Sequence, residues 1–144
     1  QLETGSLNGA LRALSERART LSGIDCRLRC PKSFLNRDDS LSVHLYRIAQ
    51  EALANAVKHG RAKRVDIRLT HNRNRLELIV EDDGIGIPEE RPARKGMGLH
   101  VMRYRANVIG GTLRVLRNRR GGTSIKCTLR NGKVENKIKG KRNT

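Results

Sequence analysis

One predicted amphipathic helix, Leu45 to Gly60, constrains this sequence more than any other feature. Read at about 100° per residue, its apolar residues form a single stripe. They are Leu45, Ile48, Ala49, Ala52, Leu53, Ala56 and Val57. Off that stripe, polar residues recur at i, i+4, i+7 and i+8 and therefore line one edge of the helix. They are Glu51, Asn55, Lys58 and His59. A carboxylate, an amide oxygen and two potential cations in one row suit an anion and a metal ion.

The composition indicates one globular domain. A chain of 144 residues suits a single two-layer core, and 36% hydrophobic with 31% charged residues is not a disordered composition. The formal net charge of +17 points, taken alone, to nucleic acid or anionic lipid. Single-strand binders, however, depend on aromatic stacking, and the aromatic residues are only Phe34, Tyr46 and Tyr104. We therefore expect no nucleic-acid partner and interpret most of the charge as solvated surface, with an acidic docking partner as the next option.

Cysteine usage indicates a reducing compartment. Cys26 and Cys30 would lie about 13 Å apart along one strand, too far for a disulfide, and Cys127 makes the number odd. No CxxC or HxxxH pattern supports a zinc site. The sequence shows neither a signal peptide nor an apolar run near the ~20 residues of a membrane helix. We expect a cytoplasmic chain, although a longer parent can still be membrane-anchored.

Periodicity predicts the order helix, strand, helix, two strands, helix, two strands. The predicted helices are 7–21, 45–60 and 97–109, and the predicted strands are 24–30, 65–72, 76–82, 112–118 and 123–130. Residues 31–39 are a connection, and Asp38, Asp39 or Ser40 is available to cap the central helix. Strands grouped in hairpins argue for an α/β (α+β) two-layer sandwich, with a mixed, mostly antiparallel sheet and helices on one face. We expect residues 1–132 to form the domain, with 1–23 as its N-terminal helix, and the basic residues 133–144 to be a disordered tail.

The stretch EDDGIGIP, residues 81–88, follows a predicted strand. A carboxylate at a strand end, such as Asp82, can accept a hydrogen bond from an exocyclic amine. Gly84 and Gly86 beside it let the backbone lie flat against a planar ring. An ordinary acidic turn is the alternative interpretation, because DG is a common turn signal.

The stretch GMGLHVM, residues 96–102, runs directly into the third predicted helix. Unpaired N–H groups and the positive end of the helix dipole then face any anion beside it. Neither GxxxxGK[ST] nor GxGxxG occurs, so the sequence carries no P-loop and no Rossmann fingerprint. A flexible turn before a helix is the alternative.

The polar edge of the central helix has a matching chemistry. Asn55 offers the hard, neutral oxygen that Mg²⁺ accepts beside waters and substrate phosphates. Lys58 and His59, one turn further on, are within reach of phosphate oxygens, and Glu51 is able to polarise a nucleophile. Considered alone, this row is equally well explained as a solvated helix edge. The three stretches together favour one nucleotide site.

The same stretches resemble the motifs of a known family. EALANAVKH (51–59) closely resembles the N box of the GHKL superfamily, whose Bergerat-fold members are gyrase-, Hsp90-, histidine-kinase- and MutL-like ATPases. DDGIGI (82–87) looks like its G1 box, and GMGLHVMRYRA (96–106) looks like its G2 box. GGT at 121–123 matches the motif that precedes the last core strand. The resemblance covers roughly residues 41–130 and is strongest to sensor histidine kinases of the nitrate-sensor type.

The resemblance implies roles for individual residues. Asp82 would bind the adenine amine, Asn55 would coordinate Mg²⁺, and Glu51 would orient or deprotonate a phosphoacceptor histidine as the catalytic residue. The ATP-binding residues that it implies are Asn55, Lys58, His59, Asp82, Gly84, Gly86, Ile87, Gly96, Met97, Gly98, Leu99 and Thr123. Of these, 96–99 would meet the triphosphate as a lid closes, and Thr123 would help close the adenine end.

The resemblance also implies a function and its partners. The chain would be the catalytic ATP-binding domain of a two-component sensor histidine kinase, using Mg²⁺-ATP to phosphorylate a histidine on an upstream dimerisation domain. None of His44, His59, His71 and His100 is followed by the acidic residue of the phosphoacceptor motif, so that domain would belong to a longer, homodimeric parent. The downstream partner would be a helix-turn-helix response regulator.

One further departure and two alternatives remain. Residues 87–95 are few and include no phenylalanine, so the F box of many histidine kinases is absent, as in the nitrate-sensor type. An anti-sigma-type serine kinase or another GHKL ATPase is the nearest alternative. A basic nucleic-acid-binding module is the second.

Overall fold

The computed structural model describes residues 6–31, 39–86 and 97–130. Its helices are α1 (Leu7–Ser22), α2 (Asp39–Lys58) and α3 (Met97–Val108). Its strands are β1 (Asp25–Arg29), β2 (Arg64–Asn72), β3 (Arg75–Asp82), β4 (Thr112–Arg117) and β5 (Thr123–Arg130). The predicted order of elements is confirmed. The central helix begins at Asp39, among the residues predicted to cap it, and Leu41 extends the buried stripe by one turn beyond Leu45.

The strands form one five-stranded sheet in the order β1-β2-β3-β5-β4. β1 is parallel to β2, and every other neighbouring pair is antiparallel. The two predicted hairpins, β2–β3 and β4–β5, both form, and β5 inserts between β3 and β4. The predicted mixed, mostly antiparallel sheet is therefore confirmed, and its central strand β3 ends at Asp82.

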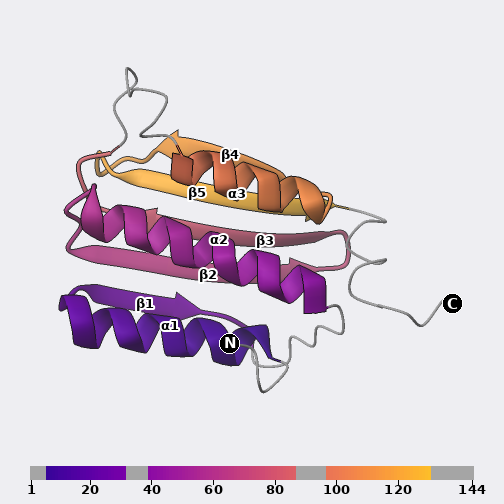
Figure 1. Ribbon diagram of the computed structural model, residues 1–144, viewed down its shortest axis with the longest axis horizontal. Coiled ribbons are helices and arrows are strands. Elements are labelled where there is room, and N and C mark those ends of the chain that lie inside the picture. Colours follow the sequence, from indigo (N-terminus) through magenta and orange to yellow (C-terminus); the bar gives the residue numbers. More distant parts are fainter. Residues whose placement is uncertain (1–5, 32–38, 87–96, 131–144) are drawn as a thin grey trace, which may run out of the picture.

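The three helices lie side by side on one face of the sheet (Figure 1). α1 runs along β1, α2 lies over β2 and β3, and α3 accompanies β4 and β5. The apolar stripe of α2 faces alternating inward side chains of the strands, and both sets are buried, except that Val57 at the end of the stripe is only partly so. The strand residues are Val65, Ile67, Leu69, Leu76, Leu78 and Val80. Burying each such side chain contributes roughly 1.5–3 kcal/mol, so this contact sets how α2 sits on the sheet.

Helix α1 has defined caps at both ends. Ser6 Oγ accepts a hydrogen bond from the Gly9 N–H at 3.0 Å. Gly23 takes the left-handed conformation at φ 72°, and its N–H donates to the Arg19 carbonyl at 3.1 Å, which is the geometry of a C-cap. Ser15 Oγ and Arg19 Nη1 both donate to the Cys26 carbonyl, at 3.2 and 2.7 Å. These bonds tie α1 to the edge strand β1.

Several predictions concern residues outside the described part of the chain. The tail 133–144, Ile87 and Gly96 are among these, and for Met97 only the backbone is described. The three cysteines are free, with Cys26 and Cys127 buried. In the described ranges, no helix is both long and apolar enough to cross a bilayer.

Candidate nucleotide-binding site

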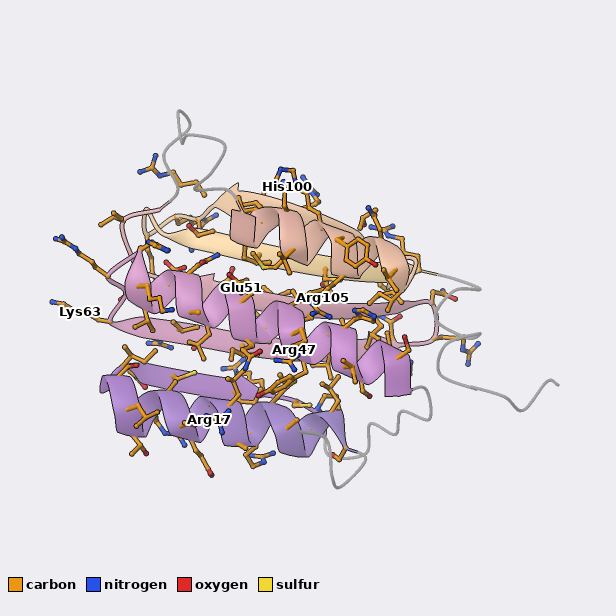
Figure 2. All side chains as sticks on the ribbon, in the orientation of Figure 1. Arg17, Arg47, Glu51, Lys63, His100 and Arg105 are labelled. Carbon is orange, nitrogen blue, oxygen red and sulfur yellow. The ribbon has the colours of Figure 1, made fainter. Side chains whose placement is uncertain are left out.

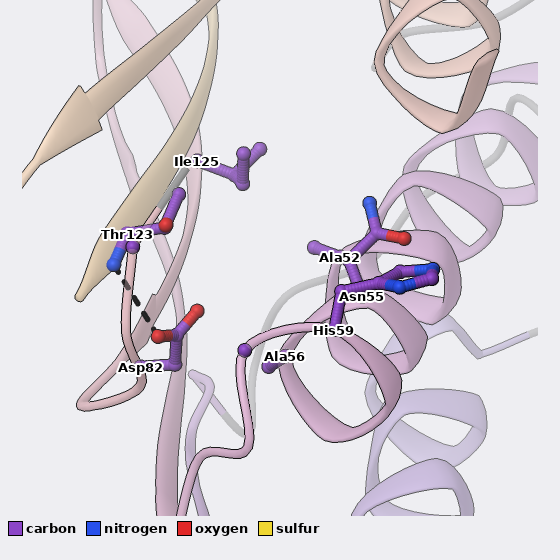
Figure 3. A pocket seen from close by; sticks show the side chains of 9 residues that line it. Ala52, Asn55, Ala56, His59, Asp82, Thr123 and Ile125 are labelled. Atoms are coloured by element: carbon purple, nitrogen blue, oxygen red, sulfur yellow. Dashed lines mark hydrogen bonds between the residues drawn. The ribbon is translucent and has the colours of Figure 1, made fainter. Parts of the chain in front are cut away.

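Asp82 lies at the end of the central strand, where its carboxylate is held by two backbone N–H groups. Gly84 donates to Oδ1 at 2.8 Å and Thr123 donates to the same oxygen at 3.3 Å (Figure 3). Oδ2 accepts no hydrogen bond from the residues that the structure describes. Burial raises the pKa of Asp82, against the lowering effect of these two N–H donors. One carboxylate oxygen is thus anchored and the other is available to a ligand.

The backbone around Asp82 is packed so closely that a side chain at Gly84 has no room. A β-carbon added to Gly84 would overlap the Gly60 carbonyl oxygen. The Ile85 N–H donates to that same oxygen at 2.8 Å, which joins the turn after β3 to the end of α2. Glycine is therefore required at position 84 because two backbone segments come close together there. Such close backbone packing also suits the flat wall of a pocket for a planar ring.

A cavity separates Asp82 from the C-terminal part of α2 (Figure 3). Asn55 and His59 border it from α2, and Asp82, Gly86 and Thr123 border it from the sheet side. Its remaining walls are mainly apolar, from Ala52, Ala56 and Ile125. The volume is about 30 Å³, on the scale of a water molecule, so a purine enters only if the walls move apart.

Helix α3 brings the second glycine-rich stretch to the polar edge of α2. Gly98 packs against Glu51, and a β-carbon on Gly98 would lie 2.6 Å from Glu51 Oε2 and 3.2 Å from Asn55 Nδ2. Figure 2 shows Glu51 on the side of α2 that faces α3. The first N–H groups of a helix have no partner within it, so the positive end of the α3 dipole lies at this polar edge of α2, next to Glu51 and Asn55.

Lys58 does not border the cavity that Asn55, His59 and Asp82 share. His59 lies about 40° from Asn55 around α2 and shares its cavity, whereas Lys58 borders a groove between α1 and α2. That groove is mainly apolar, with Leu14, Ala18 and Leu21 from α1 and Leu53 and Val57 from α2. Both Lys58 and His59 are exposed.

Two supporting residues were missed by sequence reasoning. Asp83 Oδ1 accepts hydrogen bonds from the N–H groups of Lys63 and Arg64, at 2.9 and 3.0 Å. Burial acts to raise the pKa of Asp83, but the backbone donors outweigh it and lower that pKa. Asn118 Nδ2 donates to the Asp82 main-chain oxygen at 2.8 Å. The available signals were the second aspartate of DDG and an asparagine in a turn, both of which suggest only local turn chemistry.

The chain belongs to a family of ATPases. The family model described as histidine kinase-, DNA gyrase B- and HSP90-like ATPase matches residues 40–133. This confirms the GHKL resemblance and the fold predicted from it.

Individual relatives are sensor proteins. The nitrate/nitrite sensor protein NarX of Escherichia coli K12 is 40% identical over 88 residues, which are 61% of this chain and 15% of NarX. The nitrate/nitrite sensor protein NarQ of the same strain is 31% identical over 135 residues, 93% of this chain and 24% of NarQ. The sensor histidine kinase LiaS of Bacillus subtilis is 36% identical over 86 residues, 60% of this chain and 24% of LiaS. The chain thus spans less than a quarter of each of these relatives.

Solved structures agree. The ATP binding domain of PrrB from Mycobacterium tuberculosis superposes with a TM-score of 0.66 at 28% identity, over 83% of this chain and 89% of that domain. The histidine kinase domain of a blue-light activated kinase from Erythrobacter litoralis has a TM-score of 0.77 at 19% identity, over 98% of this chain and 73% of that one. The latter likeness supports the fold alone. Both likenesses agree with the family assignment made from residues 40–133.

Proposed function

We propose that this domain binds Mg²⁺-ATP and transfers the γ-phosphoryl group to a histidine on an upstream dimerisation domain of its parent protein. The observation that carries the proposal is the Asp82 carboxylate, which has one oxygen held by backbone N–H groups and one left for a ligand beside a cavity. An adenine amine is a suitable donor for that oxygen. Gly84, Gly86, Ile87 and Thr123 would surround the base.

The phosphate end of the nucleotide is proposed to lie between α2 and the start of α3. His59 would meet phosphate oxygens, and residues Gly96, Met97, Gly98 and Leu99 would cover them. Lys58 would reach them only by turning away from the groove between α1 and α2. Phosphoryl transfer needs positioning and charge neutralisation more than covalent help, which suits such a site.

Mg²⁺ fits the donors present, with Asn55 as its protein ligand. In the described part of the chain, no three histidine, cysteine or acidic side chains form a metal-binding cluster. An ion that keeps its waters and takes its other ligands from phosphates needs no such cluster. When bound, Mg²⁺ would neutralise phosphate charge. Glu51 lies one turn before Asn55 on α2 and packs against Gly98 of α3. It would orient or deprotonate the receiving histidine.

The whole protein is proposed to be a homodimeric two-component sensor. This chain would be its domain 1–132, with 133–144 as a tail, acting at the cytoplasmic side. The relatives reported above support a response regulator as the downstream partner, and the helix-turn-helix type follows from the resemblance to nitrate sensors.

The direct test is a calorimetric titration with a non-hydrolysable ATP analogue and Mg²⁺. Wild type, Asn55→Asp and Asp82→Asn are compared. We expect wild type to bind and each variant to lose at least about tenfold in affinity. Asp82→Asn removes the charge from the acceptor of the amine, and Asn55→Asp adds a negative charge next to the phosphates. Wild-type protein that binds no nucleotide would contradict the proposal. The domain alone should not phosphorylate itself, and steady ATP turnover or a serine acceptor would favour the alternative kinase and ATPase classes.

A further inference from the structure

The turn between β4 and β5 is organised by a single side chain, Asn118. Its Oδ1 accepts hydrogen bonds from the N–H groups of Arg120 and Gly122, both at 3.0 Å. The Asn118 N–H in turn donates to the Gly122 carbonyl at 3.0 Å. Asn118 thus fixes both the path of the turn and the point at which the chain enters β5.

The same side chain reaches across to the central strand. Asn118 Nδ2 donates to the Asp82 main-chain oxygen at 2.8 Å. Gly122 is pressed against that residue as well, because a β-carbon on Gly122 would overlap the Asp82 carbonyl oxygen and lie 2.7 Å from Oδ1. An asparagine amide can make four hydrogen bonds, and Asn118 makes three of them: it accepts two at Oδ1 and donates one from Nδ2 to Asp82.

Asn118 is therefore connected to the Asp82 carboxylate by two routes. It holds the Asp82 carbonyl directly, which fixes the backbone that carries the side chain. It also holds Gly122, the neighbour of Thr123, whose N–H donates to Oδ1 at 3.3 Å. If both connections are lost, Asp82 Oδ1 is no longer held in line with the Thr123 N–H. The direction of Asp82 Oδ2 is then no longer fixed.

We propose that Asn118 is a positioning residue that orients the Asp82 carboxylate and thereby sets selectivity for nucleotides with an exocyclic amine on the base. This inference rests on the proposed function. Asn118 acts from behind Asp82 and does not border the cavity. Its removal should weaken the contact to the amine while leaving the phosphate contacts from α2 and α3 in place.

The test compares two Mg²⁺-nucleotides by calorimetry: ATP and purine ribonucleoside triphosphate, which lacks only the exocyclic amine. Wild type should prefer ATP. In Asn118→Ala we expect ATP affinity to fall about tenfold and affinity for the amine-free nucleotide to change less than about twofold. Asn118→Asp keeps an acceptor for the turn but replaces the donor to Asp82 with a carboxylate oxygen, which repels the Asp82 carbonyl oxygen. It should therefore fold and show a selective loss at least as large as that of Asn118→Ala.

A matched control is available in the other hairpin. Asn72 Oδ1 accepts the Asn74 N–H at 3.0 Å, an equivalent turn hydrogen bond at the opposite end of β2–β3, about 23 Å along the strands from Asp82. Asn72→Ala should leave the ratio of the two affinities unchanged. If the Asn118 variants leave the ratio of the two affinities unchanged, whether or not both affinities fall, the role of Asn118 is overturned while the proposed function stands. Wild type that binds neither nucleotide overturns the proposed function and this inference with it.

Discussion

Gly98, in the first turn of α3, packs against the carboxylate of Glu51 on α2, with room for no side chain between them. This contact joins residues 47 positions apart in the sequence and brings the glycine-rich start of α3 to the polar edge of α2. It also means that a small change on α3 displaces a side chain on α2.

Gly98→Ala should lower activity without lowering stability. The new β-carbon would lie 2.6 Å from Glu51 Oε2, so the Glu51 carboxylate has to move. Alanine is a better helix former than glycine by about 1 kcal/mol, which offsets the cost of that movement. We expect phosphorylation of a separately supplied dimerisation domain to slow by roughly tenfold or more, with no loss in thermal midpoint. The exposed Gly9 of α1 provides the control, since Gly9→Ala should leave the rate unchanged.

Asp82→Asn should stabilise the nucleotide-free domain while weakening ATP binding. Burial raises the pKa of Asp82 in the folded state. The favourable contribution of such a group is present below its unfolded pKa and lost as pH rises through its folded pKa, so ionised Asp82 opposes folding at neutral pH. Thermal unfolding against pH should therefore show the variant gaining over wild type as pH rises through that interval. A variant that is less stable at neutral pH would contradict this expectation.

The same shift predicts how ATP binding depends on acid. Only the ionised carboxylate accepts from the amine without offering a proton of its own. As pH falls through the raised pKa of Asp82, the preference for ATP over the amine-free nucleotide should decline, beginning above the 3.8 of an ordinary aspartate. Both nucleotides carry the same triphosphate, so comparing their affinities at each pH removes the effect of phosphate protonation. A constant preference across this interval would count against Asp82 as the acceptor.

Asp83→Ala should loosen the joint between α2 and β2. It leaves the N–H groups of Lys63 and Arg64 without their acceptor, which should cost about 1 kcal/mol in urea unfolding. Because the pKa of Asp83 is lowered in the folded state, this contribution is present above its unfolded pKa and is lost as pH falls through the folded pKa. The difference between wild type and variant should therefore shrink in acid. A difference that is independent of pH would contradict the assignment.

The charge of +17 should produce only weak, salt-sensitive binding to DNA. Exposed cations attract phosphates without a fitted surface, so affinity should fall steeply between low and physiological salt. Fluorescence anisotropy with duplex DNA across salt tests this, and ATP titrations in parallel show whether the two ligands compete. Tight binding that persists in high salt would favour the nucleic-acid-binding alternative.

Periodicity was sufficient to predict most of the fold. The stripe of α2 and the alternation in β2 and β3 each reflect burial on one face, which is a local property of the chain. The start of α2 could be predicted only to within the capping residues 38–40, because its first turn is mostly polar; burial of Leu41 against the core shows that the helix reaches Asp39. The insertion of β5 between β3 and β4 had no local signal, since strand order depends on contacts distant in sequence.

The sequence by itself determined the residue types of the candidate site: a helix edge with Glu51 and Asn55, an aspartate at a strand end, and glycines where backbone must come close. Tertiary structure alone decided which of them meet. It brought His59 to the cavity and turned Lys58 toward α1, although the two are adjacent in the chain. It also placed Asn118 behind Asp82, 36 residues away. The physical reason is that spacing defines a face of one element, while partners across elements are set by how the faces pack.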